Sequence, residues 1–487
     1  MILPAEKSNR YLRHTIMPEI GASGQTRLLE SHIAVFASSA RCVAPLLYYL
    51  VSSGLGNIKC FIEGIEGISP LVENLRDLNP DVNIIEMIEL SDAAEVFHNC
   101  SGNTEKNTSC RIIFGNYDFI KNIIKSINNI NDRCKTHYVP TIIAAVENWQ
   151  GIIQAVKKPE NTFLFNNTVS GHAIISTAPA NKLAVGYLFS CCLAGALAAI
   201  ESIKLCLNIG NFLECPLYFD LLTMNFKKLN GNDNIPNAHH LPSEEKPDDI
   251  QNKILDSKVL IVGTGGLGSP AAYALSLSGV GSLGLVDSDR VEISNLNRQI
   301  LHSTSRIGTP KVKSAEVFIR KLNPNINVIT YETRFTKSNA MRIIRDYDVI
   351  IDGVDNLPTR YLLNDSCFFA EKTLVEAGVL RFEGLGMTLV PKKGHCYRCI
   401  FPEPPPANSI PSCSQAGILG PVPGVMGFIE AAEAFKLLAG IGKTLQSQLL
   451  IFDALDLDFR ITQVKRDENC PLCGEMPSIK EPIEYEI

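Results

Sequence analysis

The sequence carries one strand–turn–helix–strand pattern twice, at a shift of 225 residues (position 263 against position 38). In the C-terminal copy, residues 258–262 (KVLIV) lead into the glycine-rich turn GTGGLG at 263–268 and then into an apolar segment of helical character. In the N-terminal copy, residues 32–37 (HIAVFA) precede a similar apolar segment, in which Pro45 matches Pro270. Such a repeat predicts two domains of the same fold, each beginning with a βαβ unit.

The two copies differ at the turn where a phosphate would bind. Small residues at such a turn let backbone N–H groups and the start of the following helix approach a phosphate, whereas side chains block that approach. We therefore predict that only the C-terminal copy binds a nucleotide. The replaced positions are Gly263, Gly265, Gly266, Gly268 and Asp287, which become Ser38, Ala40, Arg41, Val43 and Ile62.

The order of strand and helix patterns predicts an α/β protein. We expect two tandem Rossmann-like, doubly wound domains with mainly parallel sheets, related by a pseudo-two-fold axis. The expected boundaries are 1–226 for the N-terminal half, 227–249 for a polar linker and 250–487 for the C-terminal half. Strands are expected at 258–262, 283–287, 326–330, 348–352, 373–377, 384–391 and 448–453, and helices at 269–278, 311–322, 337–345, 358–369 and 425–438.

Composition narrows the class of protein. Hydrophobic residues make up 45% and charged residues 20% of the 487 residues, which is typical of a soluble globular chain. The net charge of −6 argues against a nucleic-acid partner. Fifteen cysteines without an export signal favour free thiols, metal ligands and a cytoplasmic location.

The most apolar stretch, 183–200, is near the lower limit of length for a membrane span. It continues into Glu201 and Lys204, and the same Glu-x-x-Lys spacing recurs at Glu433 and Lys436. A helix that ends alike in both copies is expected to be a core helix, so we predict no membrane contact.

Polar residues after the glycine turn decide which nucleotide the C-terminal copy suits. The turn alone would also fit a nicotinamide-dependent dehydrogenase. Arg298, Lys311 and Asp355 add two cations and one carboxylate, which suit a triphosphate with Mg²⁺. Taken singly, Lys311 could be a solvated helix residue and Asp355 a helix N-cap before Pro358.

In this order the motifs resemble the ThiF/MoeB/HesA family, relatives of ubiquitin-activating enzymes, over residues 250–475. Residues 1–226 resemble a degenerate member of the same family. The resemblance implies ATP-dependent adenylation of the C-terminal carboxylate of a small ubiquitin-like protein, with Asp287 on the ribose and Asp355 on Mg²⁺. The nucleotide-binding residues expected in this way are Gly263, Gly265, Gly266, Gly268, Asp287, Asp289, Asn295, Arg298, Gln299, Lys311 and Asp355.

The family also takes an arginine from the leading helix of a partner subunit, in a pattern similar to Arg-Tyr-x-Arg-(Gln/His). That pattern is present here only in the N-terminal half, from Arg10 to His14, while the C-terminal half has the unrelated segment 236–240 (PNAHH). We therefore predict that Arg13 reaches the site of the other half. The alternative is that Arg10 and Arg13 form a solvated helix face.

Two CxxC pairs lie near the C-terminus. Four thiolates in two short loops form a closed tetrahedral Zn²⁺ site with no open position for substrate, so a structural role is expected. The residues are Cys396, Cys399, Cys470 and Cys473.

Cys413 lies alone in a proline-rich loop. Some members of the family carry a cysteine here that forms covalent intermediates, which implies a catalytic role for Cys413. The alternative is an inert thiol, because such a role requires thiolate character.

Three functions compete at this stage. The first is adenylation of a ubiquitin-like sulfur carrier, and the second is the same chemistry on a ribosomal peptide. The third is a nicotinamide-dependent oxidoreductase or a non-catalytic scaffold. A homodimer of such two-domain chains is a further expectation.

Overall fold

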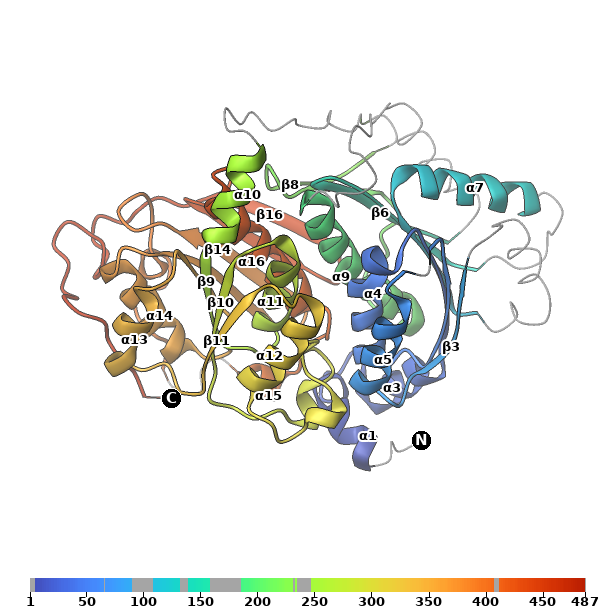
Figure 1. Ribbon diagram of the computed structural model, residues 1–487, viewed down its shortest axis with the longest axis horizontal. Helices are drawn as coiled ribbons and strands as arrows, with labels where there is room; N and C mark the ends of the chain where they lie inside the picture. The colour runs from blue at the N-terminus through green and yellow to red at the C-terminus, as the bar shows by residue number, and fades with distance from the viewer. Residues whose placement is uncertain are drawn as a thin grey trace.

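The computed structural model describes residues 5–64, 66–89, 108–131, 139–157, 185–230, 233, 247–406 and 411–486. Within these ranges the chain forms two eight-stranded sheets with helices between and around them (Figure 1). Most of the predicted linker lies outside the described residues, as does the segment 236–240.

The two sheets have the same strand order. The first is β3-β2-β1-β4-β5-β6-β7-β8 and the second is β11-β10-β9-β12-β13-β14-β15-β16. In each sheet the first five strands are parallel and the last three pair antiparallel, so the predicted α/β class with mainly parallel sheets is confirmed. The strands of the first sheet are β1 His32–Ala37, β2 Asn57–Ile62, β3 Asn83–Glu89, β4 Cys110–Gly115, β5 Thr141–Glu147, β6 Gln150–Val156, β7 Leu217–Asp220 and β8 Asn225–Lys228. Those of the second are β9 Lys258–Val262, β10 Ser282–Val286, β11 Asn327–Tyr331, β12 Val349–Asp352, β13 Thr373–Leu380, β14 Glu383–Leu389, β15 Gln448–Asp453 and β16 Asp458–Gln463.

The helices follow the same division. In the N-terminal half they are α1 Ala5–Arg10, α2 Leu12–Thr15, α3 Gly21–Glu30, α4 Ala40–Ser53, α5 Ile68–Leu78, α7 Tyr117–Asn131 and α9 Val185–Leu207. In the C-terminal half they are α10 Pro247–Asp256, α11 Gly268–Ser278, α12 Lys311–Leu322, α13 Lys337–Ile344, α14 Leu357–Phe369, α15 Cys413–Ala416 and α16 Val422–Ala439, with short 3₁₀ turns η3 Ile293–Asn295, η4 Thr304–Arg306 and η5 Tyr397–Cys399.

Four helices, α4, α9, α11 and α16, lie between the two sheets (Figure 1), and they pack against one another across the halves. The aromatic rings of Tyr48 and Tyr273 meet edge to face at 5.7 Å, and those of Tyr49 and Phe428 do so at 6.1 Å. The buried apolar side chains of both halves form one continuous cluster. The halves therefore share a core, because the helices that cover the inner face of one sheet pack directly against the helices that cover the inner face of the other.

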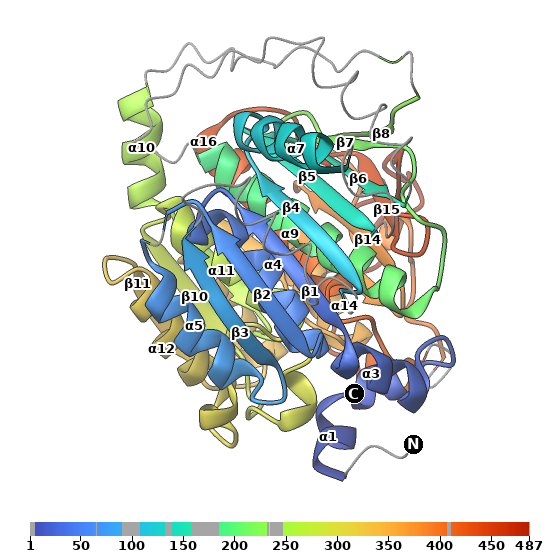
Figure 2. The ribbon, with the colours of Figure 1, turned by 90° about the vertical axis from the view of Figure 1, so that its right-hand side faces the viewer.

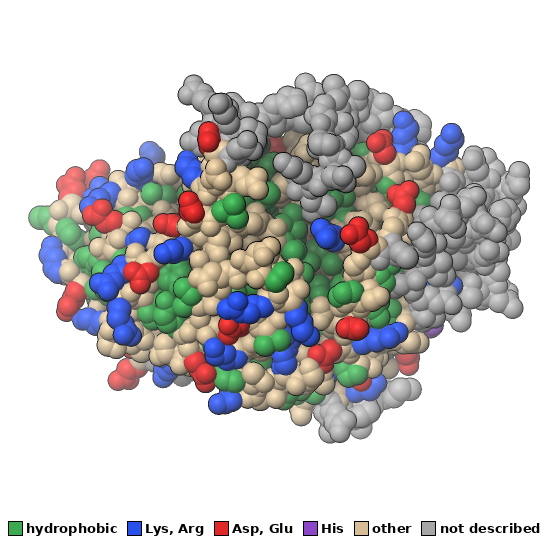
Figure 3. Space-filling view, viewed as in Figure 1, with side chains coloured by type: hydrophobic (Ala, Val, Ile, Leu, Met, Phe, Trp, Pro, Cys, Tyr) green, Lys and Arg blue, Asp and Glu red, His purple; other side chains and the backbone are tan. Residues whose placement is uncertain are grey.

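The outer faces are covered separately. Helix α7 lies on the outer face of the first sheet (Figure 2), where its apolar residues join a second cluster with Phe36 and Phe61. Helices α13 and α14 cover the outer face of the second sheet. On the face drawn in Figure 3, the basic and acidic side chains of the described residues are interspersed, in keeping with the absence of a basic bias in the composition.

Helix α9 is the one described helix that is long and apolar enough to cross a membrane. Of its apolar window, 94% is buried inside the structure, between the first sheet and helices α4 and α16. This is the position expected for a core helix, and its apolar surface is accounted for by packing within the protein.

The repeat extends to buried ion pairs at the ends of α9 and α16. Lys204 pairs with Glu201 at 2.9 Å, and Lys436 pairs with Glu433 at 2.6 Å, all four side chains being fully buried. Each glutamate also accepts a backbone hydrogen bond from the loop that follows its helix, from Leu213 in one half and from Leu445 in the other. A buried charge is tolerated only when it is paired in this way.

Candidate adenylate site and cysteine cluster

The glycine-rich turn lies between β9 and α11. Gly263 has a φ of +91°, which side-chain-bearing residues rarely adopt. A Cβ on Gly268 would lie 1.9 Å from the Gly263 carbonyl oxygen, so the backbone itself excludes larger residues there. At Gly265 the nearest atom to an added Cβ is the Gln299 amide nitrogen, at 3.5 Å. The fold requires Gly263 and Gly268, while Gly265 keeps one side of the turn open.

Asp287 directly follows β10 and is half-buried. Its Oδ2 accepts hydrogen bonds from the Thr264 backbone N–H at 2.8 Å and from the Thr264 hydroxyl at 3.0 Å. Its Oδ1 accepts the backbone N–H of Asp289 at 2.9 Å. The Asp287 carboxylate thus holds the glycine turn in place through Thr264. The sequence prediction did not include Thr264 among the site residues.

Lys311 is the first residue of α12, and its side chain is only 9% exposed. Its Nζ lies 2.8 Å from Asp289 Oδ2, and its backbone N–H donates to the Asp289 carbonyl. Burial excludes the interpretation of Lys311 as a solvated helix residue. The exposed Asp289 carboxylate holds the ammonium in place from the solvent side, so an incoming anion can replace that partner.

Arg298 is buried against the turn, with its Cδ 3.6 Å from a Cβ built on Gly266. Its guanidinium donates to the Ser294 carbonyl at 3.0 Å and to the Asn297 side-chain oxygen at 2.9 Å. Burial, together with the positive charge of Arg13, lowers the pKa of Arg298 to about 10. Two cations from different halves therefore lie near each other, an arrangement that favours binding of an anion between them.

The segment around Arg298 is rigid and polar. Asn295 closes a capping box on η3, where its side-chain oxygen accepts the Glu292 backbone N–H at 3.0 Å. The side-chain oxygen of Gln299 (Oε1) and the side-chain nitrogen of Asn297 (Nδ2) are buried and have no hydrogen-bond partner within the described part of the chain. Buried polar atoms are normally paired, so these two indicate a place where a ligand or water binds.

Asp355 is exposed and lies just after β12. Its negative charge acts to raise the pKa of Arg298, so the two side chains are near each other. Asn356, not Asp355, caps α14, because its side-chain oxygen accepts the Thr359 backbone N–H at 3.0 Å. The interpretation of Asp355 as a helix N-cap is therefore wrong, and its carboxylate is left without a capping role.

The turn that carries Asp355 is held by a buried ion cluster that the sequence analysis missed. Arg360 pairs with Asp352 and with Glu376, both at 3.1 Å, and also donates to the Val354 carbonyl. Burial raises the pKa of Glu376 to about 7, while the charge of Arg360 opposes that shift. The available signal was the presence of a carboxylate in each of two otherwise apolar strands.

Arg13 comes from α2 of the N-terminal half. Its Nη1 donates to the Ser414 carbonyl at 3.1 Å, and its own carbonyl accepts the Ile418 N–H at 3.1 Å. Its Nε is buried and has no hydrogen-bond partner among the described residues. The guanidinium is thus brought to the C-terminal half and retains a free donor there.

Arg10 differs from Arg13 because its hydrogen-bonding groups are committed. It is 3% exposed, donates to the Leu78 carbonyl at 2.9 Å and to the Thr304 hydroxyl at 3.0 Å, and lies 3.8 Å from Asp81. Arg10 therefore joins the two halves structurally. A purely solvated face for Arg10 and Arg13 is excluded, because one is buried and the other is in contact with Ser414.

Cys413 begins the short helix α15, beside Arg13 and β13. Its thiol donates to the Val379 carbonyl at 3.3 Å. Burial raises the pKa of Cys413, and the nearby charge of Arg298 opposes that rise. In this conformation the thiol form is favoured, so a covalent role stays a prediction.

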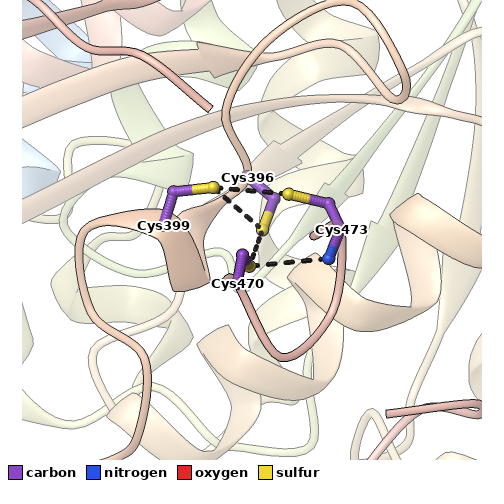
Figure 4. A group of neighbouring side chains, drawn as sticks. All are labelled: Cys396, Cys399, Cys470 and Cys473. Atoms are coloured by element: carbon purple, nitrogen blue, oxygen red, sulfur yellow. Dashed lines mark hydrogen bonds between the residues drawn. The ribbon is translucent and has the colours of Figure 1, made fainter. Parts of the chain in front are cut away.

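The four cysteines of the CxxC pairs converge in one cluster (Figure 4), with all four sulfur atoms within 4.8 Å of one another. The Cys396–Cys470 sulfurs are 3.5 Å apart and the Cys399–Cys473 sulfurs 3.3 Å. Tetrahedral thiolates around Zn²⁺, with Zn–S bonds of about 2.3 Å, lie about 3.8 Å apart. The donor set and its spacing fit that ion, and the cluster attaches the C-terminal segment to η5.

Comparisons with known proteins cover mainly the C-terminal half. Residues 238–472 match the model of the ThiF family. The chain is 44% identical over 241 residues to a sulfur carrier protein adenylyltransferase of Thermus thermophilus, which covers 48% of this chain and 89% of that protein. It is 45% identical over 238 residues to the SAMP-activating enzyme E1 of Haloferax volcanii, covering 49% and 88%.

A third relative is longer. The adenylyltransferase and sulfurtransferase MOCS3 of Sus scrofa is 46% identical over 237 residues, which covers 48% of this chain and 52% of that protein. This chain therefore spans about half the length of that relative. Among solved structures, E. coli MccB with MccA-N7isoASN is similar with 23% identity and a TM-score of 0.43, covering 47% of this chain and 70% of that one.

Proposed function

Because the chain belongs to the ThiF family, we propose that its C-terminal half uses ATP to adenylate the C-terminal carboxylate of a small ubiquitin-like sulfur-carrier protein and releases pyrophosphate. The relatives named as a sulfur carrier protein adenylyltransferase and a SAMP-activating enzyme support this activity and this class of partner. Neither the peptide-modifying nor the nicotinamide-dependent alternative is favoured by these relatives.

One observation carries the proposal: a cation from the N-terminal half lies near the buried cation that packs against the glycine turn of the C-terminal half. Arg298 and Lys311 come from the C-terminal half, and Arg13 comes from α2 of the N-terminal half. A triphosphate and a carboxylate repel each other, so their reaction needs positive charge fixed in advance at both reactants. The open side of the turn at Gly265 offers space for the phosphates beside these groups.

In the proposed reaction, a carboxylate oxygen attacks the α-phosphorus of ATP in line with the leaving pyrophosphate. A bond forms between that oxygen and the α-phosphorus, and the bond to the bridging oxygen of the β-phosphate breaks. The carboxylate is already anionic at neutral pH, so no general base is required. Lys311 would exchange Asp289 for a phosphate oxygen, while Arg298 and Arg13 would hold the developing charge.

Two metal ions belong to the proposal. The exposed Asp355 carboxylate, near Arg298, fits a ligand for the Mg²⁺ that accompanies ATP and neutralises phosphate charge. The cysteine cluster fits Zn²⁺, which would stabilise the C-terminal segment without contact to substrate. Asp287 and Asn295, one at the turn and one at the capping box, are proposed to contact the ribose and the phosphates.

A covalent intermediate on Cys413, a homodimer and a cytoplasmic location are further proposals of this account. Trapping of a carrier–enzyme adduct that is lost in Cys413→Ser would support the first. The mass of the protein in solution would decide the second, and imaging of the tagged chain in its host would decide the third.

ATP–pyrophosphate exchange tests the adenylation proposal. Small host proteins ending in Gly-Gly would be added one at a time, each beside a matched form that lacks the final glycine. We expect exchange with one carrier and none with its shortened form. Exchange that ignores the carboxyl terminus, or no exchange with any such carrier, would contradict the proposal.

A further inference from the structure

The contact between the halves contains a histidine that the proposed reaction does not use. His14 ends the motif that supplies Arg13, its side chain is completely buried, and it reaches residue 420 of the other half. We propose that His14 is a positioning residue, which holds Arg13 and the Arg298 segment in register across the interface. This inference rests on the proposed adenylation function and names a further residue needed for it.

Hydrogen bonds fix the tautomer of His14. The backbone N–H of Gly420 can only donate, and it lies 3.0 Å from His14 Nε2, so that nitrogen is the acceptor. The proton is therefore on Nδ1, which donates to the Gln25 side-chain oxygen at 2.9 Å. The Gln25 amide in turn donates to the Ser53 carbonyl at the end of α4. One continuous chain of hydrogen bonds thus joins the core helix of the N-terminal half to Gly420.

The C-terminal end of this chain lies against the candidate site. A Cβ built on Gly420 would lie 2.4 Å from the Asn297 carbonyl oxygen, so these two backbones are in close contact. Asn297 accepts a hydrogen bond from the Arg298 guanidinium at 2.9 Å. The position of Gly420, set by His14, is therefore transmitted through Asn297 to Arg298.

The same segment also fixes Arg13. The Ile418 N–H donates to the Arg13 carbonyl at 3.1 Å, two residues before Gly420. Consecutive residues of α2 thus bind alternate residues of the segment that leads into α16. A side chain at position 14 without an acceptor would leave the Gly420 N–H unpaired in a buried place and would loosen both arginines together.

The side chain at position 14 must be uncharged and must offer one hydrogen-bond acceptor, for Gly420, and one donor, for Gln25. Arg298 lies near enough for its positive charge to oppose protonation of the ring. A glutamine side chain offers an acceptor and a donor at its end and is uncharged, so it can replace the imidazole. A phenylalanine fills similar space and offers neither group.

Calorimetric titration of the full chain with magnesium and α,β-methylene-ATP tests the proposal, because binding of this analogue requires no carrier. We expect His14→Phe to weaken binding about tenfold, the effect of losing about 1.4 kcal/mol, and His14→Gln to restore most of it. In an Arg13→Ala background, the added effect of His14→Phe should fall to about threefold, since one of the two groups it positions is already missing and the effect through Arg298 remains.

Gln154→Ala serves as a matched control. Gln154 is as completely buried as His14 and donates to the Glu214 carbonyl at 2.7 Å within the N-terminal half. The Gln154→Ala variant should have a lower midpoint of thermal unfolding but bind the ATP analogue as tightly as the unaltered protein. If His14→Phe does not fold, Gln25→Met tests the same chain one bond further from the site, with an expected loss of about threefold that also becomes smaller without Arg13.

The outcomes separate this inference from the proposed function. Equal weakening by His14→Phe with and without Arg13, or failure of His14→Gln to restore binding, would overturn the positioning role alone. No binding of the analogue by the unaltered protein would overturn the adenylation proposal and this inference together.

Discussion

The two halves share a strand order but differ at the turn that follows their first strand, β1 or β9. In the C-terminal half, five residues separate β9 from α11, and they form the glycine turn. In the N-terminal half, only Ser38 and Ser39 separate β1 from α4. The helix begins earlier there, and the Ser39 hydroxyl accepts the backbone N–H of Cys42 as its cap. The backbone N–H group of Cys42, at the start of α4, is therefore bound by the Ser39 cap and is not left open toward a phosphate.

Side chains pack against the first turn of α4 in the N-terminal half. The Cys42 sulfur lies 3.0 Å from that of Cys191, and the Tyr187 hydroxyl donates to Cys42 at 3.2 Å. Ile62, at the position of Asp287, is completely buried. The two halves thus keep the same strand order and paired core helices, while the turn between the first strand and the first core helix differs between them.

The largest effect is expected at the residue that the N-terminal half supplies. Arg13→Ala should lower the rate of carrier-dependent ATP–pyrophosphate exchange on the order of a thousandfold, by analogy with other arginines that stabilise phosphoryl transfer. Arg41→Ala is the control, because Arg41 is exposed at the N-terminal counterpart of Gly266. An unchanged rate in Arg13→Ala would mean that the C-terminal half works alone.

Removal of the proposed Zn²⁺ should release the C-terminal segment from the rest of its half. A chelator that strips Zn²⁺ should lower the midpoint of thermal unfolding by about 10 °C, since the site attaches the C-terminal segment. Cys470→Ser should show the lower midpoint from the start and no further shift with chelator. A chelator-dependent shift that persists in Cys470→Ser would place the metal elsewhere.

The repeated buried ion pairs allow a direct comparison of stability. Lys436→Met should lower the free energy of unfolding by about 3–5 kcal/mol, because it leaves the Glu433 carboxylate buried without a cation. Lys436 also donates to the Leu221 and Lys443 carbonyls, whereas Glu201 is the partner that the described residues give Lys204. Lys204→Met should therefore cost less. Urea unfolding of both variants measures the difference, and equal costs would contradict it.

A smaller effect is expected from two buried histidines, one from each half. Burial, with the charge of Arg298, lowers the pKa of His14 to about 4, and burial, with the charges of Lys311 and Arg306, lowers that of His302 to about 3. Both values lie below the 6.5 of an unfolded histidine. Their stabilisation is complete above pH 6.5 and is lost as the pH falls toward 4 and 3.

Each histidine should therefore cost about 2 kcal/mol of unfolding free energy between pH 7 and pH 5. Urea unfolding at the two pH values measures the summed loss of unfolding free energy from both histidines. His14→Gln should remove the part of that loss that comes from His14. The same pH dependence in His14→Gln as in the unaltered protein would show that His14 does not titrate in this way.

Local pattern was sufficient to predict much of this architecture. The expected strands 258–262 and 373–377 fall within β9 and β13, because apolar runs bounded by turn residues carry their own signal. The convergence of the CxxC pairs was also predictable, since four thiols at that spacing have few alternatives. By contrast, the edge strands β8 and β16 were not predicted, because their mixed polar sequences show little periodicity.

Contacts between distant segments could not be predicted. The Asp289 partner of Lys311 and the Arg360 cluster depend on where separate loops meet in space. The capping of α14 by Asn356 in place of Asp355 depends on a single hydrogen bond at a helix end, where boundaries are uncertain by a residue or two. The His14–Gly420 contact joins residues 406 positions apart.

We propose that each chain has one nucleotide site, formed on the C-terminal half and completed by Arg13. Calorimetric titration of the unaltered protein with magnesium and α,β-methylene-ATP measures the number of such sites. One molecule should bind per chain, with affinity reduced in Arg13→Ala and in Arg298→Ala. Two molecules bound per chain, or none, would contradict it.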